Sequence, residues 1–156
     1  MKRYYIAYGS NLNLSQMRFR CPTAEVRGTT LLKGWELLFK GSGTGSYLTI
    51  ERRDGGEVPA VVWEVTAEDE KALDLYEGYP SFYYKHEIRV RYKGIRTGRY
   101  RTVTAFAYIM HEERPVGIPS CMYMRTCLEG YRTFGFDRAV LFRAYTRSER
   151  LIENEI

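Results

Sequence analysis

The sequence predicts a single α+β domain in which a small, mostly antiparallel β-barrel or strongly curled sheet is flanked by helices. Two observations support this prediction: short apolar runs with strand-like patterns are separated by turns, and helical segments are interspersed without the repeated period of a parallel sheet. The chain has 156 residues, of which 44% are hydrophobic and 28% charged. That is enough for one core, so we expect one domain over residues 1–156.

Charge and hydropathy limit the classes of partner. Lys and Arg total 24 against 19 Asp and Glu, a net charge of +5, and the basic residues are spread over several segments. Arg89, Arg91, Arg96, Arg99 and Arg101 fit the solvated side of a hairpin better than a nucleic-acid surface, so we expect no nucleic-acid partner. No apolar run approaches a membrane span, and the N-terminus lacks a secretory pattern. We expect a cytoplasmic monomer or homodimer without a membrane partner.

The cysteines and histidines do not predict a metal site. Cys21, Cys121 and Cys127 form no Cys-x-x-Cys pair, and His86 and His111 are not grouped with them. This spacing argues against zinc and against a disulfide framework. A cysteine nucleophile working with His111 is the alternative to a free buried thiol, which is the commoner case.

The first element is a strand that ends in a tight turn. The apolar run Tyr4 to Ala7 leads into Tyr8-Gly9-Ser10-Asn11-Leu12, which predicts a turn and a short helix through roughly Met17. Gly9 tolerates positive φ, and Ser10 and Asn11 can bond neighbouring backbone groups or cap the helix. The N–H groups of such a turn can hold a carboxylate or phosphate. Many strand-to-helix connections use the same residues only to reverse the chain.

Two hairpins follow in the prediction. Ala24 to Leu32 and Trp35 to Lys40 read as strands broken at Gly34, and the Gly-Ser-rich tract 41–46 follows them. The tract lacks the Gly-Lys-Ser/Thr ending of a nucleotide-binding loop, and a flexible hairpin loop is favoured over a mobile flap. The chain returns in a strand at residues 47–52, turns at 54–56, and reaches a buried apolar strand at 60–65.

The next predicted helix places a carboxylate at its end. Thr66-x-x-Asp69 indicates a capping box for a helix over residues 67–76, and Gly78 suits a left-handed C-terminal cap before Pro80. Glu77 therefore lies at the negative end of the helix, beside several aromatic residues. Both features would raise the pKa of its carboxyl, as a general base requires. The alternative, commoner for an isolated glutamate, is an exposed residue that merely ends a helix.

The last third of the chain predicts two strands and two helices. Residues 84–93 alternate as a half-exposed strand, with His86 on the apolar face as a core or pocket-wall residue, and residues 100–110 return as a strand that is apolar on both faces from Val103. Ser120 caps a helix through Thr133, which Gly135 closes. A final helix runs from Asp137 to about residue 150, and the end of the chain frays.

Several motifs occur in one order along most of the chain. They are Tyr8-Gly9-Ser10-Asn11-Leu12 after the first strand, Val61-Val62-Trp63, Ala72-Leu73-Asp74-x-x-Glu77-Gly78, Tyr84-Lys85, Pro119-Ser120-x-x-Tyr123, and Gly130-Tyr131-x-x-Phe134-Gly135. Together they resemble the γ-glutamylcyclotransferase-like family. The resemblance implies a small barrel with flanking helices and a reaction that cyclises a γ-glutamyl amide to 5-oxoproline and releases the amine.

The resemblance also implies roles for individual residues. Glu77 matches the catalytic acid/base. The residues that match substrate-binding positions are Tyr8, Gly9, Ser10, Asn11, Leu12, Tyr84 and Tyr123. The reaction needs no metal and no cofactor, because Glu77 can take a proton from the substrate's own amine, which then attacks the side-chain carbonyl.

Several γ-glutamyl compounds are candidate substrates. Members of the family act on glutathione, γ-glutamyl amino acids, γ-glutamyl amines or protected intermediates. We expect the stretch 79–84 and the loop 111–119 to line the rest of the substrate pocket. A basic surface would suit an anionic leaving portion, and a cationic amine is the alternative.

A non-catalytic module that binds a γ-glutamyl or other carboxylate metabolite is the rival function, although a carboxylate such as Glu77 does not help to bind an anion.

Overall fold

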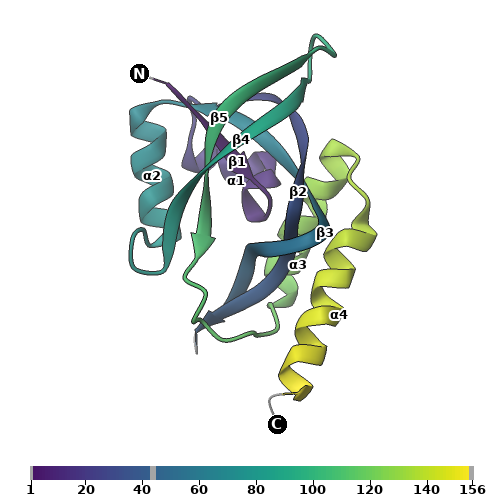
Figure 1. The fold of residues 1–156 in the computed structure, drawn as a ribbon. Helices are drawn as coiled ribbons and strands as arrows, with labels where there is room; N and C mark the ends of the chain where they lie inside the picture. Colours follow the sequence, from purple (N-terminus) through teal and green to yellow (C-terminus); the bar gives the residue numbers. More distant parts are fainter. Residues whose placement is uncertain (1, 43–44, 155–156) are drawn as a thin grey trace.

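Five strands close into a barrel in the computed structural model, which describes residues 2–42 and 45–154 (Figure 1). The barrel order is β1-β3-β2-β4-β5, and every pairing is antiparallel except that of β1 with β5. The strands are β1 (Arg3–Ala7), β2 (Glu25–Ser42), β3 (Gly45–Val65), β4 (Tyr83–Gly94) and β5 (Tyr100–Met110). The predicted α+β fold, a mostly antiparallel barrel with helices, is confirmed.

The β2–β3 hairpin is longer and more continuous than the sequence predicts. Both predicted breaks lie inside strands: at Gly34, with φ of 86°, and at Gly55, with φ of 78°. Pairing shifts register between Lys33 and Trp35, so these glycines form an irregularity in one ladder instead of separating strands. Pairing extends to Ser42 opposite Gly45, and the centre of the predicted Gly-Ser loop, residues 43–44, lies outside the described residues.

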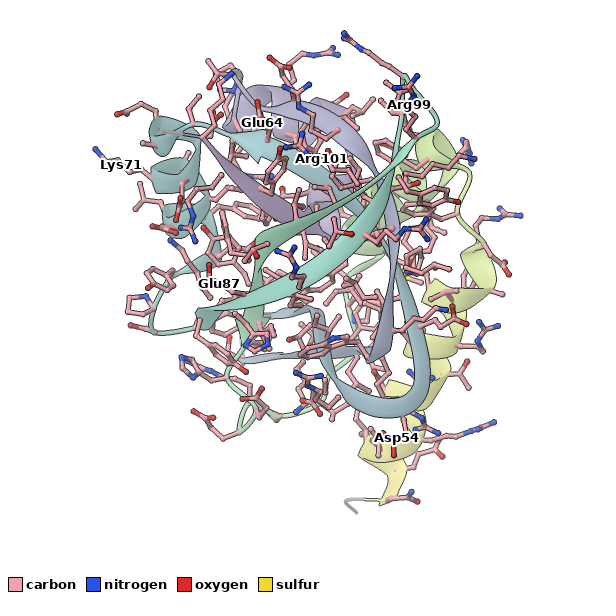
Figure 2. All side chains as sticks on the ribbon, turned by 45° about the horizontal axis from the view of Figure 1, so that its top comes forward. Asp54, Glu64, Lys71, Glu87, Arg99 and Arg101 are labelled. Atoms are coloured by element: carbon pink, nitrogen blue, oxygen red, sulfur yellow. The ribbon has the colours of Figure 1, made fainter. Side chains whose placement is uncertain are left out.

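The β4–β5 hairpin carries the exposed basic residues. Val90 and Tyr92 are buried while the intervening Arg91 is exposed, so the predicted alternation is confirmed in this half of β4. Strand β5 is buried on both faces from Ala105 onward, two residues later than predicted. Figure 2 shows the side chains of Arg99 and Arg101 on this hairpin.

The helices cover opposite sides of the barrel. Helix α2 (Ala67–Glu77) lies on one side, and α3 (Cys121–Phe134) and α4 (Arg138–Asn154) lie together on the other (Figure 1). The capping box of Thr66 and Asp69 is confirmed, and Gly78 ends α2 in the left-handed conformation. Ser120 caps α3 and Gly135 closes it, also as predicted. Helix α4 extends to Asn154, four residues beyond the predicted end.

The described residues contain no disulfide and no group of three or more His, Cys, Asp or Glu that could hold a metal ion. Cys21 and Cys127 are buried, and Cys121 is exposed. His86 packs its ring against Trp35, with centroids 5.7 Å apart, which fits the predicted core-wall role. Across residues 2–42 and 45–154, no helix is both long and apolar enough to traverse a lipid bilayer.

Candidate active site

The turn after β1 is built from two short helical pieces. A 3₁₀ turn, η1 (Ser10–Leu12), precedes α1 (Leu14–Arg20), and the N-cap of α1 is Asn13, whose Oδ1 accepts the N–H of Gln16 at 3.2 Å. The predicted cap at Ser10 or Asn11 is therefore wrong, because the 3₁₀ turn takes up residues 10–12 and the α-helix starts only after Asn13. The N–H groups of Leu12 and Asn13 donate to the carbonyls of Gly9 and Ser10 within the turn.

Gly9 serves close packing and not the predicted left-handed backbone. Its φ is −129°, outside the left-handed region. A Cβ atom at this position would lie 3.2 Å from Tyr123 Oη and 3.4 Å from Leu48 Cβ. The turn therefore lies directly against the start of β3 and against α3, where a larger residue would displace Tyr123.

A cavity of about 360 Å³ opens beside this turn. Its wall comes from the turn, the β2–β3 hairpin, the end of α2, β4, β5 and α3. The residues that line it are Tyr5, Ile6, Tyr8, Gly9, Ser10, Asn11, Ser42, Tyr47, Leu48, Leu75, Tyr76, Glu77, Gly78, Phe82, Tyr83, Tyr108 and Tyr123. Segments that are far apart in the sequence therefore meet around one small space.

Glu77 is the last residue of α2 and faces this cavity. It lies deep within the protein while part of its surface stays accessible through the cavity. Burial raises the pKa of its carboxyl to about 8, and the nearby Arg20 guanidinium opposes that rise. The carboxyl is therefore mostly neutral at pH 7 and ionises just above it, in the range where it can both accept and return a proton.

Five tyrosines surround Glu77, and we call them the tyrosine cluster: Tyr5, Tyr8, Tyr83, Tyr108 and Tyr123. Burial raises the pKa of every phenol in the cluster, and the Glu77 carboxylate contributes to each rise. The hydroxyls therefore stay protonated near neutral pH. All five hydroxyls have a hydrogen-bond partner. Three of them donate: Tyr8 Oη to the Tyr108 carbonyl at 2.6 Å, Tyr83 Oη to the Leu48 carbonyl at 2.9 Å, and Tyr108 Oη to Asp74 Oδ1 at 2.5 Å. The other two accept: Tyr123 Oη from the Leu48 N–H at 3.1 Å, and Tyr5 Oη from Asn11 Nδ2 at 2.9 Å.

Arg20 connects the turn to the end of α2. Its guanidinium lies 3.3 Å from the ring centroid of Tyr76 and donates to Asn11 Oδ1. Asn11 Nδ2 in turn donates to Tyr5 Oη at 2.9 Å, and Ser10 Oγ lies 3.0 Å from Tyr76 Oη. This network fixes the position of the turn relative to Glu77. Our sequence analysis missed Arg20, because only the folded path of α1 brings it back to α2.

The cavity contains most of the residues singled out by sequence, but not all. Tyr8, Gly9, Ser10, Asn11, Glu77 and Tyr123 line it. Leu12 does not: its side chain is fully buried against α3, where a Cβ on Gly130 would lie 2.5 Å from Leu12 Cβ.

Tyr84 also lies off the cavity wall. Its hydroxyl donates to Glu112 at 2.5 Å, and its ring faces His111 with centroids 5.1 Å apart. The loop 111–119 supplies no lining residue, against expectation, whereas the stretch 79–84 supplies Phe82 and Tyr83. Alternation along β4 explains why Tyr83 lines the cavity and Tyr84 does not, because neighbouring residues of a strand point to opposite faces.

The other lining tyrosines could be found only in part from sequence. Tyr5 lies in the first apolar run and Tyr108 in the last strand, and both looked like core residues. Tyr47 begins the return strand of the hairpin, where nothing in the local pattern indicates that it turns toward Tyr123. In the structure the two rings are perpendicular, with centroids 5.3 Å apart.

Comparison with known proteins gives one family. A family model described as "Gamma-glutamyl cyclotransferase, AIG2-like" matches residues 5–125. The chain is 31% identical over 141 residues to a gamma-glutamylcyclotransferase of Homo sapiens, covering 84% of this chain and 71% of the relative, and 30% identical over 139 residues to that of Bos taurus, with the same coverage.

Solved structures agree with the sequence matches. One named gamma-glutamyl cyclotransferase superposes with a TM-score of 0.75 at 28% identity, covering 86% of this chain and 81% of the other. A yeast structure described as a gamma-glutamyl cyclotransferase specific to glutathione has a TM-score of 0.55 at 12% identity, covering 94% of this chain and 99% of the other, and shares the fold alone.

Proposed function

This chain belongs to the γ-glutamyl cyclotransferase, AIG2-like family, and on that premise we propose that it cyclises the γ-glutamyl group of a γ-glutamyl amino acid or amine to 5-oxoproline, releasing the free amine. Glu77 acts as the general acid/base. The observation that carries the proposal is a carboxyl with a pKa of about 8 that faces a small cavity beside the Tyr8–Asn11 turn. A carboxyl tuned to this range suits proton transfer near neutral pH.

The turn supplies a place for the substrate's α-carboxylate. The N–H groups of Ser10 and Asn11 begin a helical turn, so they have no acceptor within it. Both residues line the cavity. Holding the carboxylate there would position the α-amine near Glu77 and fold the glutamyl chain toward its own side-chain carbonyl. Such orientation accelerates an intramolecular attack.

The pKa values of the substrate amine and of Glu77 are close to each other in this site. The α-amino group of a peptide has a pKa of roughly 8, and the free α-carboxylate of a γ-glutamyl substrate raises the pKa of its own amine somewhat above that value. Both lie near the value of about 8 to which burial raises the pKa of Glu77. The approach of an ammonium favours the carboxylate form of Glu77. The carboxylate then takes one ammonium proton, and the freed lone pair attacks the γ-carbonyl carbon, forming the ring C–N bond.

The leaving amine departs with the same proton. Tyr5 Oη and Tyr123 Oη accept hydrogen bonds from Asn11 and from the Leu48 N–H, so each hydroxyl can donate its own proton to the oxyanion that develops on the carbonyl oxygen. Collapse of this intermediate breaks the original C–N bond, and Glu77 returns its proton to the departing nitrogen. The ring nitrogen still carries one excess proton, which the regenerated Glu77 carboxylate takes and passes to the released amine. The products are therefore 5-oxoproline and the amine in its ammonium form, and Glu77 regains its carboxylate state.

Mass spectrometry of the reaction mixture tests this function. The protein is incubated with γ-glutamyl amino acids, γ-glutamyl amines and glutathione, and 5-oxoproline is quantified. We expect product from the wild type and a loss of about 10² to 10⁴-fold in Glu77→Gln, the range for a general base. Glu68→Gln is the matched control, because Glu68 is an exposed residue at the start of the same helix. An active Glu77→Gln variant would place the base elsewhere.

The same panel distinguishes catalysis from binding alone. If no member yields product but γ-glutamyl compounds raise the melting temperature of the wild type, the protein is a binding module and not an enzyme. The Glu77→Gln variant should still bind, because a neutral amide occupies the same space.

A further inference from the structure

The net positive charge of the chain comes from a stretch of one hairpin that does not line the cavity. Residues 89–101 hold six basic and no acidic side chains, so the rest of the chain carries 18 basic and 19 acidic groups. These six residues lie on the β4–β5 hairpin, where Figure 2 shows Arg99 and Arg101, and none of them lines the cavity. The basic balance of the protein therefore gives no support to an anionic substrate.

The cavity itself is almost free of charge. Among the described residues that line it, Glu77 alone has an ionisable acid or base other than tyrosine. The lining also includes the side chains of Tyr47, Leu75 and Phe82, and the rings of Tyr47 and Phe82 meet with centroids 6.3 Å apart. Leu75 is 85% exposed although it borders the cavity, so an aliphatic side chain stands at the mouth.

Two cations that contact lining residues, Arg20 and Arg114, are already engaged. Arg20 lies on Tyr76 and donates to Asn11 and Gln16. Arg114 lies 4.6 Å from the ring centroid of Phe82 and, like Arg20, is not part of the cavity lining.

We propose, as an extension of the cyclotransferase function, that the preferred substrates are γ-glutamyl amides of apolar primary amines that carry no second carboxylate. A leaving amino acid would bring its carboxylate against Tyr47, Leu75 and Phe82, where no lining cation meets it. Its negative charge would also disfavour the carboxylate form of Glu77 that must accept the proton. Whatever hydration the carboxylate loses against Tyr47 and Phe82 is not replaced by an ion pair, which costs free energy. An alkyl or aryl amine instead buries apolar surface on the same wall.

A matched pair of substrates isolates the carboxylate. γ-Glutamyl-3-methylbutylamine and γ-glutamylleucine differ only by the leucine carboxylate, and glutathione adds a natural anionic comparison. Initial rates of 5-oxoproline formation give kcat/KM for each. We expect the amine conjugate to exceed γ-glutamylleucine by about tenfold or more, which corresponds to about 1.4 kcal/mol.

A positive charge placed at the mouth of the cavity should weaken or reverse the preference for the amine conjugate. Leu75→Arg puts a cation beside the leaving group, so the ratio of the two kcat/KM values should fall toward or below one. Leu31→Arg is the control: it makes the same substitution at a half-exposed position on β2 that does not line the cavity. Its ratio should equal that of the wild type.

The outcomes separate this inference from the function on which it rests. Equal or faster turnover of γ-glutamylleucine or glutathione by the wild type would overturn the apolar preference while leaving the cyclotransferase function intact. An unchanged ratio in Leu75→Arg would show that the leaving group does not lie against this wall, which also overturns it. Absence of 5-oxoproline from every substrate would overturn the function itself.

Discussion

At the scale of single residues, the chemistry depends on how Glu77 is surrounded. Sequence reasoning predicted a raised pKa from the helix dipole and neighbouring tyrosines, and in the structure burial is the largest cause. The residues that bury it come from β1, β4, β5 and α3 as well as from α2. Local sequence identifies only those that follow Glu77 directly.

The pH dependence of the reaction should report this residue. One proton must be shared between Glu77 and the substrate amine. Below pH 7 both groups are protonated, and well above pH 8 both are deprotonated. We therefore predict a bell-shaped profile of kcat/KM with its maximum near pH 8, because burial raises the pKa of Glu77 to about 8. On the acid side of the profile, the acid limb, kcat/KM should fall about tenfold for each pH unit. An acid-side decline centred near pH 4.5 would contradict the assignment of Glu77 as the general base.

Arg20 should set the position of that acid limb. Removing its charge with Arg20→Met takes away the group that lowers the pKa of Glu77, so the acid limb should move to higher pH and kcat/KM at pH 7 should fall. Arg20→Lys should restore part of the shift because it retains the charge. Arg18→Met, at an exposed position on the same helix, serves as the control. A loss of activity equal at every pH would mean that Arg20 acts only by packing.

At the scale of elements, the ends of helices decide where the site residues lie. The caps of α2 and α3 were predictable because a capping box and a C-terminal glycine are local signals. The start of α1 was not, because the 3₁₀ turn before it moves the cap to Asn13. Likewise Gly34 and Gly55 read as strand breaks, and only pairing with the opposite strand shows that they lie within a ladder.

The C-terminal cap of α2 should matter for catalysis as well as for stability. Gly78→Ala and Gly98→Ala both place a Cβ on a left-handed residue, with φ of 63° and 67°, and each should cost about 1 kcal/mol of unfolding free energy. Only Gly78 follows Glu77, and its new Cβ would lie 3.3 Å from Phe82 Cβ. We expect similar decreases in chemical denaturation midpoint but a lower kcat/KM only for Gly78→Ala. Equal activity in the two variants would show that the cap does not position Glu77.

At the scale of the whole molecule, barrel closure and helix docking assemble the site. Sequence patterns predicted the fold class and the turn, but no local pattern could place Tyr47, Tyr108 and Tyr123 around one carboxyl. Helix α3 docks on η1 through Gly130, whose Cβ position would be only 2.5 Å from Leu12 Cβ. This contact joins residues that are 118 positions apart, and it sets the spacing between Tyr123 and the turn.

Gly130→Ala should therefore disturb both the core and the site. Overpacking of this kind costs typically about 1 to 3 kcal/mol, so we expect a lower melting temperature. We also expect a higher KM, since α3 would carry Tyr123 away from the turn. Thr133→Ala, on an exposed position of the same helix, should change neither strongly. A destabilised Gly130→Ala variant with the KM of the wild type would show that α3 does not help to shape the binding site.

Attack by the substrate's own amine, and not by water, is the central claim of this account. The most direct test is to run the reaction with a γ-glutamyl amine in water enriched in ¹⁸O and to analyse the products by mass spectrometry, with Glu77→Gln beside the wild type. We predict 5-oxoproline without ¹⁸O from the wild type and almost none from the variant, because cyclisation adds no oxygen. Glutamate carrying one ¹⁸O atom would contradict the claim, since it would identify water as the nucleophile and the protein as a hydrolase.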